Sequence, residues 1–272
     1  MNQIPFIDPI AFQLGPISIH WYGISYLAGI ILGWTYLKLY VSRFSKSWSS
    51  VEIDDLVFYA AIGAVIGGRI GYTFFYDWGS FVENPIKIFA LWEGGMSFHG
   101  GIIGVAVALF FFAKKTEKNL LSVGDFFVPA VPIGLGLGRC ANFVNQELWG
   151  LPSNVSWAVT FTNPAAGFIA RHPSQLYQAV GEGLIIFVLL FFFVRVELRE
   201  GKVTALFLIF YSFFRFSAEF FREPDAHLGY ILGGWLTMGQ ILTVPLMFIG
   251  LAIFFKDIVD IKTIKRNMLI LF

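Results

Sequence analysis

Polar side chains that can bind an anion gather in one short stretch of an otherwise apolar chain. The stretch "GRCANFVNQELWG", residues 138–150, contains Arg139, Asn142, Asn145 and Glu147. Arg139 and Asn142 are three residues apart, so on a helix they lie on nearly the same face. A guanidinium fork flanked by amides fits the oxygens of a phosphate better than a lysine ammonium does. The stretch therefore predicts a site for an anionic headgroup.

A second polar stripe follows further along the chain. Its members, spaced by four, four and three residues, share one helical face and are Tyr211, Arg215, Glu219 and Arg222. We expect Glu219 to neutralise part of the charge of both arginines within the helix. One carboxylate against two guanidiniums still leaves a net positive charge, which is costly in apolar surroundings without an anionic partner. The stripe therefore favours the same anionic ligand.

A histidine near a predicted helix start offers a general base. In "GGMSFHGGIIG", residues 94–104, Ser97 occupies the expected N-cap and His99 the first helical turn. The positive end of the helix dipole disfavours the imidazolium form, so a neutral His99 could accept a proton. Gly100 and Gly101 would let a substrate approach the backbone there. The alternative is that His99 only bonds a neighbouring helix.

The composition places these residues in a membrane. The chain has 272 residues, of which 57% are hydrophobic and 14% charged, and its mean hydropathy is +0.70. Apolar runs of about 20 residues match the thickness of the hydrocarbon layer. We expect an all-α polytopic integral membrane protein with about seven transmembrane helices. The predicted spans are residues 17–37, 56–75, 97–113, 121–143, 175–194, 203–221 and 236–255.

The basic residues predict how these spans are oriented. Lysines and arginines cluster in alternate connections and in the tail: Lys38, Arg43 and Lys46; Lys114, Lys115 and Lys118; Arg195, Arg199 and Lys202; Lys256, Lys262, Lys265 and Arg266. By the positive-inside rule these segments are cytoplasmic, so the N-terminus is outside, in the periplasm, and the C-terminus is cytoplasmic. We expect residues 1–272 to form a single catalytic domain, with a small outer-face loop at about 77–95 and an outer-face segment at about 147–172.

This topology brings the polar clusters to one side of the membrane. Six segments converge on the outer leaflet, which predicts a site open to lipid and to the outside water. Arg69 is at the outer end of the second span, where it could reach a phosphate or only pair with Glu93 or Asp77. The nearby stripe of Gly63, Gly67 and Gly71 favours close helix packing.

Several classes of function are disfavoured. The single cysteine, Cys140, excludes an intramolecular disulfide and a CxxC site, and we do not expect it to be a nucleophile. The chain has no GxSxG, HExxH or Walker A motif, and its four histidines are scattered. We therefore expect no metal, no cofactor and no nucleic-acid partner.

The polar stretches together resemble the bacterial prolipoprotein diacylglyceryl transferase family. Besides residues 138–150, the similarity extends to "HWYG" (20–23), "GGRIGY" (67–72), "GGMSFHGG" (94–101), "RHPSQLY" (171–177), "FRFSAEFFREPD" (214–225) and "TMGQ" (237–240). These motifs cover the chain in order from end to end. Several matches in register are more specific than any single motif.

The resemblance implies the first step of bacterial lipoprotein maturation, at the inner (cytoplasmic) membrane. The family transfers the diacylglyceryl group of phosphatidylglycerol, a membrane lipid, to the thiol of the lipobox cysteine in a preprolipoprotein, and releases glycerol phosphate. It implies that Arg139 and Arg215 bind the phosphate of the leaving group. His99 is the candidate for taking the thiol proton, with arginine-assisted deprotonation as the alternative.

The resemblance also implies the remaining site residues. The residues that would shape the pocket are Asn142, Asn145, Glu147 and Gly150, and those that would hold the arginine network are Tyr22, Glu219 and Arg222. From their positions in the sequence, we also expect Arg69 and Tyr211 to bind substrate. One departure concerns Gln178, because the family commonly has glutamate at this position. Glu182, one helical turn further on, could substitute for that acid.

Two other classes of protein remain open. A transporter or flippase for anionic lipids would use the same arginines but would move lipid without forming a covalent product. A passive structural subunit would tolerate the loss of Arg139 or His99 apart from effects on stability.

Overall fold

The structure is a computed structural model that describes residues 2–15, 17–45, 47–90, 94–196, 198–224, 229–231 and 233–269, with residues 257–269 as backbone only. The predictions made for Lys46, Glu93 and the side chains of Lys262, Lys265 and Arg266 lie outside these described parts. Packing divides the chain into two compact units. One unit contains Met1–Gly33 and Phe127–Phe272, and the other contains Trp34–Phe126.

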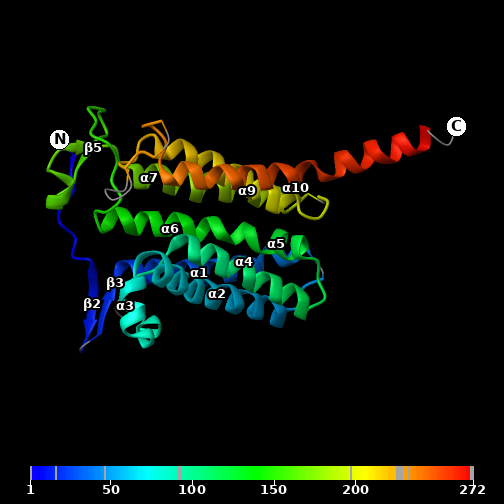
Figure 1. The fold of residues 1–272 in the computed structure, drawn as a ribbon, viewed down its shortest axis with the longest axis horizontal. Helices are drawn as coiled ribbons and strands as arrows, with labels where there is room; N and C mark the ends of the chain where they lie inside the picture. The colour runs from blue at the N-terminus through cyan, green and yellow to red at the C-terminus, as the bar shows by residue number, and fades with distance from the viewer. Residues whose placement is uncertain are drawn as a thin grey trace. The chain divides into compact units, whose positions relative to one another are not determined.

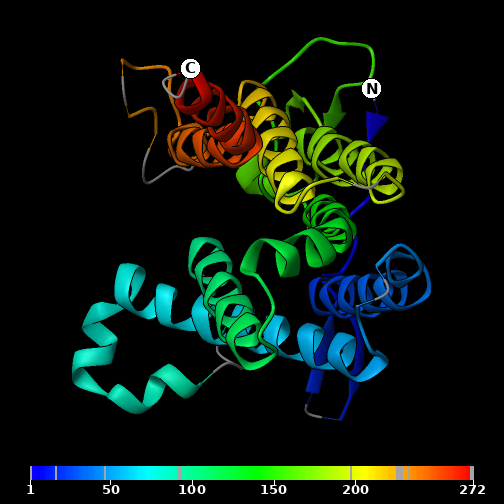
Figure 2. The same ribbon diagram turned by 90° about the vertical axis from the view of Figure 1, so that its right-hand side faces the viewer.

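The unit Trp34–Phe126 is helical. After the end of α1 (Trp21–Leu39), its elements are η1 (Val41–Arg43), α2 (Ser50–Tyr76), α3 (Trp78–Glu83), η2 (Pro85–Phe89), α4 (Phe98–Lys115) and α5 (Leu120–Phe127). Helices α2 and α4 form its main packing interface (Figure 2). The predicted outer-face loop at 77–95 contains α3 and η2.

The α2–α4 interface is a glycine contact, which confirms the packing predicted for the stripe. A β-carbon on Gly63 would lie 2.5 Å from the carbonyl oxygen of Gly104, and one on Gly67 would lie 2.3 Å from that of Gly100. At these positions any larger residue would force the helices apart. Gly100 therefore serves helix packing, and the expectation that it leaves room for substrate is wrong. Gly101 is less crowded, since a β-carbon there would lie 3.5 Å from its nearest neighbour, the Ala64 carbonyl oxygen.

A capping box starts α2. The Ser49 hydroxyl accepts a hydrogen bond from the Glu52 backbone N–H at 3.2 Å, and the Ser49 N–H donates to the Glu52 carboxylate at 2.8 Å. Glu52 also pairs with Lys118 at 3.0 Å. The Ser49 backbone N–H, followed by Lys118, lowers the pKa of the Glu52 carboxyl below its ordinary value. This end of α2 precedes the predicted span.

The other unit carries the longer set of elements. Its helices besides the start of α1 are η4 (Val128–Ala130), α6 (Val131–Val144), η5 (Pro164–Ala166), α7 (Ser174–Gln178), the π-helix η6 (Ala179–Ile185), α8 (Ile186–Phe193), α9 (Lys202–Glu219) and α10 (Met238–Leu269). Helices α9 and α10 run side by side, in yellow and in orange to red (Figure 1). A core of Val128, Ile186, Leu190, Val203 and Tyr211 joins η4, α8 and α9.

The helices agree with a multi-pass membrane protein. Within the described residues, five helical stretches are long and apolar enough to cross a membrane: Trp21–Arg43, Phe98–Lys115, Leu120–Val144, Ser174–Phe193 and Met238–Lys256. The two other predicted spans coincide with α2 and α9, which are helices but are not among these five. Seven spans and the orientation of the termini therefore stay predictions.

Short strands correct the expectation of an all-α protein. Strands β2 (Ile10–Leu14) and β3 (Ile17–His20) form an antiparallel pair. Strand β4 (Val159–Thr160) lies between β1 (Asn2–Gln3), which is parallel to it, and β5 (Ala170–Arg171), which is antiparallel. Strands of two residues carry no periodic pattern, so the sequence could not reveal them. They tie the N-terminal residues to the predicted outer segment 147–172.

Candidate functional site

Five charged side chains form a chain of alternating sign. In order they are Arg139, Glu182, Arg215, Glu219 and Arg222. Glu182 accepts from Arg139 at 3.3 Å and lies 3.9 Å from Nη1 of Arg215. Glu219 lies 2.8 Å from Arg215 and 2.9 Å from Arg222. Three guanidiniums thus face two carboxylates, so these five side chains together carry one net positive charge. They are called the charged chain below.

The charged chain is shielded from water. Glu182 is fully buried, and the side chains of the three arginines are 8–13% exposed. Buried charges need close partners because desolvation costs several kcal/mol for each ion. The two carboxylates supply these partners among the described residues.

The contact between α6 and η6 positions Arg139 against Glu182. A β-carbon on Gly183 would lie 2.6 Å from the Gly136 Cα, so the two backbones touch. Arg139 is three residues after Gly136, and Glu182 is next to Gly183. The π-helical turn at Ala179–Ile185 inserts one extra residue per turn at this point, a feature frequent at functional sites. Close backbones and this local turn explain how a short glutamate reaches the arginine.

The start of α10 positions Glu219. The Thr237 hydroxyl donates to Glu219 Oε2 at 2.7 Å. Thr237 and Gln240 form a reciprocal capping box, with bonds of 3.0 and 3.2 Å between each backbone N–H and the other side chain. A β-carbon on Gly239 would lie 2.9 Å from the Glu219 carboxyl carbon. The "TMGQ" motif therefore fits the α10 terminus closely around the ion pair.

The polar stretch after Arg139 mainly shapes the backbone. Asn142 donates to the Glu147 carboxylate at 2.8 Å. Gln146, with a φ of +53°, bonds Pro5, Thr162 and Asn163, and so connects the end of α6 to the outer segment. Asn145 ends α6 through its backbone, while its buried Oδ1 has no hydrogen-bond partner among the described residues. Asn145 thus has a buried acceptor that no described residue uses.

Gly150 fits between two other backbone segments. Its N–H donates to the His172 carbonyl at 3.0 Å, and it forms an isolated bridge with Arg222. A β-carbon at this position would lie 2.3 Å from the His172 oxygen and 2.6 Å from the Phe221 oxygen. Only glycine fits, so Gly150 holds the outer segment against the residue that ends the charged chain.

The "RHPSQLY" motif contributes a second ion pair and lines a cavity. Arg171 pairs with Glu223 at 2.7 Å and donates to the carbonyls of Ala166 and Gly150. The Tyr177 hydroxyl bonds Trp157 Nε1 at 2.7 Å and His172 Nδ1 at 3.0 Å. These three rings border a cavity of about 500 Å³ whose lining residues are Val155, Trp157, His172, Tyr177, Phe214, Ser217, Ala218 and Phe221. Helix α9 therefore faces this cavity on one side and carries the charged stripe beside it.

Two predicted tyrosines differ in their surroundings. Tyr211 is buried, and its hydroxyl interacts electrostatically with Glu182, Arg215 and Arg139. Tyr22 bonds the hydroxyl of Tyr26 at 2.9 Å. Tyr26, which the sequence did not single out as a site residue, interacts electrostatically with Arg139 and Glu147. Tyr22 thus bonds a second tyrosine that lies within electrostatic range of Arg139.

His99 and Arg69 belong to the other compact unit, Trp34–Phe126. Ser97 caps α4 as predicted, accepting from Gly100 N–H at 3.2 Å, and His99 is exposed in the first turn. Arg69 is buried and donates to the carbonyls of Ile88, Lys87, Gly94 and Gly95. These contacts attach the outer loop to α2. A place for either residue beside Arg139 stays a prediction.

The sequence missed part of the site. Glu182 was noted only as a substitute for an acid at position 178, although it is the carboxylate that joins the two arginines. Gln178 is fully buried, and neither atom of its amide has a hydrogen-bond partner among the described residues. Thr237 carried a motif match without an assigned role. A buried acid in an apolar span is a signal that would have identified Glu182.

A comparison with protein families decides the assignment. The family model for prolipoprotein diacylglyceryl transferase matches residues 9–256. This chain belongs to that family. The matched region includes the whole charged chain from Arg139 to Arg222, as well as His99 and Arg69. The resemblance inferred from the motifs is therefore confirmed.

Curated relatives named phosphatidylglycerol–prolipoprotein diacylglyceryl transferase are similar over almost their full length. The relative from Coxiella burnetii (strain RSA 331 / Henzerling II) is 49% identical over 251 residues, covering 92% of this chain and 95% of its own. Those from Pseudomonas paraeruginosa and Pseudomonas putida are each 49% identical and cover 93% of this chain, with 94% and 95% of their own lengths. The similarity to this transferase family thus includes both compact units.

Proposed function

We propose that this protein transfers the diacylglyceryl group of phosphatidylglycerol to the lipobox cysteine thiol of a preprolipoprotein, the first step of lipoprotein maturation. The product is a thioether, and glycerol phosphate is released. The observation that carries the proposal is the buried chain of alternating charges in a member of this family. Its net positive charge is suited to the phosphodiester of an anionic lipid.

The geometry suggests how the arginines act. Arg139 and Arg215 share Glu182, which holds both guanidiniums near each other before a substrate binds. When the cysteine sulfur attacks the glycerol carbon, the bond from that carbon to the phosphate oxygen breaks, and negative charge grows on the leaving phosphate. Preorganised cations at this point stabilise the transition state more than the ground state.

The membrane arrangement completes the proposal. Seven spans, a periplasmic N-terminus and a cytoplasmic C-terminus in the bacterial inner membrane place the charged chain toward the outer leaflet. There phosphatidylglycerol and an exported lipobox peptide meet. His99 is proposed to accept the thiol proton, and Asn142, Asn145, Glu147, Tyr22, Tyr211 and Arg69 to contribute to substrate binding.

Mass spectrometry tests the activity directly. Purified protein is incubated with phosphatidylglycerol and a lipobox-cysteine peptide, with a Cys→Ser peptide as control. We expect the cysteine peptide alone to gain one diacylglyceryl group, and glycerol phosphate to appear in equal amount. No adduct from folded protein that still binds the lipid would instead support a lipid transporter.

The base is tested separately. A His99→Gln variant should transfer slowly and should lose the part of the pH–rate profile that reports imidazole protonation. An unchanged rate at every pH would mean that another group takes the proton.

A further inference from the structure

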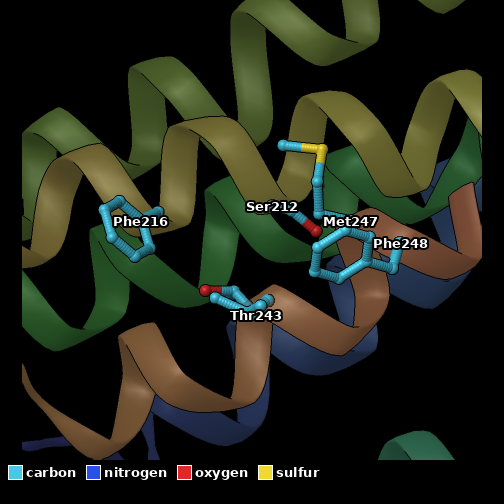
Figure 3. A pocket seen from close by; sticks show the side chains of 6 residues that line it. Ser212, Phe216, Thr243, Met247 and Phe248 are labelled. Carbon is cyan, nitrogen blue, oxygen red and sulfur yellow. The ribbon is translucent and has the colours of Figure 1, made fainter. Parts of the chain in front are cut away.

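A small cavity between α9 and α10 contains an unusual hydroxyl group. The cavity has a volume of about 190 Å³ and is lined by Ser212, Phe216, Thr243, Val244, Met247 and Phe248 (Figure 3). Ser212 is 1% exposed, and its Oγ has no hydrogen-bond partner among the described residues. In Figure 3 this oxygen points toward Met247 and Phe248.

Helical serines usually avoid this state. A serine in a helix can donate to the carbonyl four residues earlier, and Ser217 on the same helix does so, to Phe213 at 2.8 Å. Thr243, on the other wall of the cavity, donates to Gln240 at 2.7 Å. A buried hydroxyl without a partner costs about 1–3 kcal/mol. Ser212 is therefore a donor held ready for an acceptor that is brought into the cavity.

The cavity is connected to the charged chain along one helix face. Gly239, Thr243 and Met247 are spaced by four and so share a face of α10. At Gly239 this face approaches Arg215, whose Nη2 would lie 3.1 Å from a β-carbon there. The face that contacts Arg215 thus continues, one turn further on, into the cavity.

Along α9, the serine hydroxyl and the arginine follow one another in the same order as the ester carbonyl and the phosphate of a glycerophospholipid. Ser212 precedes Arg215 by three residues, which is about 4.5 Å along the helix axis and about 60° around it. In a glycerophospholipid the ester carbonyls lie deeper than the phosphate, and the acyl chains follow them. A ligand with its phosphate at Arg215 would bring an ester carbonyl to the level of Ser212.

We propose that this cavity is the acyl-ester subsite for the lipid substrate, with Ser212 donating to one ester carbonyl while the first part of that acyl chain lies against Phe216, Val244, Met247 and Phe248. This inference rests on the proposed function, because that function supplies the lipid. Ser212 would then be a residue that distinguishes ester-linked from ether-linked lipids. Three residues after Met247, Gly250 packs closely on Ala205, Leu208 and Ile209.

The test compares two lipids on two proteins. Transfer to the lipobox peptide is measured with phosphatidylglycerol carrying ester-linked chains and with an analogue carrying ether-linked chains of equal length, which lacks the carbonyl acceptors. We expect the unmodified protein to prefer the ester in kcat/KM by about fivefold or more, the value of one hydrogen bond. The Ser212→Ala variant should lose that preference. Ser42→Ala, a control serine whose hydroxyl donates to the Lys38 carbonyl at 2.7 Å, should keep it.

A second Ser212 variant and a binding measurement test the subsite where Ser212→Ala does not fold or no transfer occurs. Ser212→Cys retains the size but is a weak donor, so it should also lose the preference if Ser212→Ala does not fold. Thermal stabilisation by the two lipids, without peptide, tests the subsite even if no transfer occurs, which separates its failure from that of the proposed function. Equal use and equal binding of both lipids by the unmodified protein, or an unchanged preference in both Ser212 variants, would overturn the proposal.

Discussion

Replacing Glu182 by glutamine tests whether the chain of alternating charges is an energetic unit. Glu182 lies 3.3 Å from Arg139 and 3.9 Å from Arg215. At an effective dielectric constant of about 20, each attraction amounts to about 4–5 kcal/mol before desolvation is subtracted. Glutamine has almost the same shape and can still accept from Arg139, but it leaves two net positive charges where there was one.

We expect Glu182→Gln to lower the free energy of unfolding by about 3 kcal/mol, the lower end of the range for breaking a buried ion pair. For a chain of this size, that corresponds to a decrease in Tm of roughly 6–12 °C. Because the carboxylate and a lipid phosphate compete for the same guanidiniums, phosphatidylglycerol should raise the Tm of the variant more than that of the unmodified protein.

Thermal unfolding in detergent, followed by tryptophan fluorescence with and without phosphatidylglycerol, measures both effects. The matched control is Asp55→Asn, which breaks a pair with Lys115 in which both side chains are about half exposed, and which should change Tm little. A Glu182→Gln protein as stable as the control, with no extra response to the lipid, would refute the reasoning.

Three other changes probe separate features. Arg139→Ala should reduce transfer to the lipobox peptide by about 100-fold or more while the protein still inserts in the membrane, since a preorganised cation is lost; a normal rate by mass spectrometry would remove Arg139 from the phosphate site. Gly150→Ala should cost about 1–3 kcal/mol because its β-carbon meets two backbone oxygens at 2.3 and 2.6 Å, whereas Gly138→Ala, which has open space, should not lower Tm. The folded pKa of Glu52 is lowered, so the stability that its carboxylate contributes is complete above the ordinary pKa of 4.5 and is lost as the pH falls through the folded pKa. Glu52→Gln should therefore flatten the acid side of a plot of Tm against pH. An unchanged acid side would exclude the Glu52 carboxylate as the source of the loss of Tm there.

Features that depend on the spacing of residues along a single helix were predictable from the sequence. The stripe of Arg215, Glu219 and Arg222 forms the ion pairs that helical spacing requires. Ser97 caps α4 because a serine before an apolar run satisfies a free backbone N–H. The stripe of Gly63 and Gly67 packs against another helix, since small residues at this spacing serve little else in an apolar helix.

Features that depend on tertiary contacts were not predictable in this way. The link from Arg139 to Glu182 joins separate segments and needs a π-helical turn, which has no pattern in the sequence. The carbonyl partners of Arg69 belong to irregular backbone, so the sequence offered only side-chain partners for it. Short strands such as β4 are set by neighbouring segments and carry too few residues for any period to appear.

The glycine contacts restrict how these helices can change during evolution. Gly136 faces Gly183, and Gly63 faces Gly104, so both sides of each contact already have the smallest residue. In most packed interfaces a larger residue on one side can be balanced by a smaller one opposite it. Here no smaller residue exists, and a second-site suppressor at the facing position is impossible. Mutants at Gly183, Gly63 or Gly104, where a β-carbon would lie within 2.6 Å of the facing backbone, should regain function only by reversion at the same codon or by changes that move a whole helix.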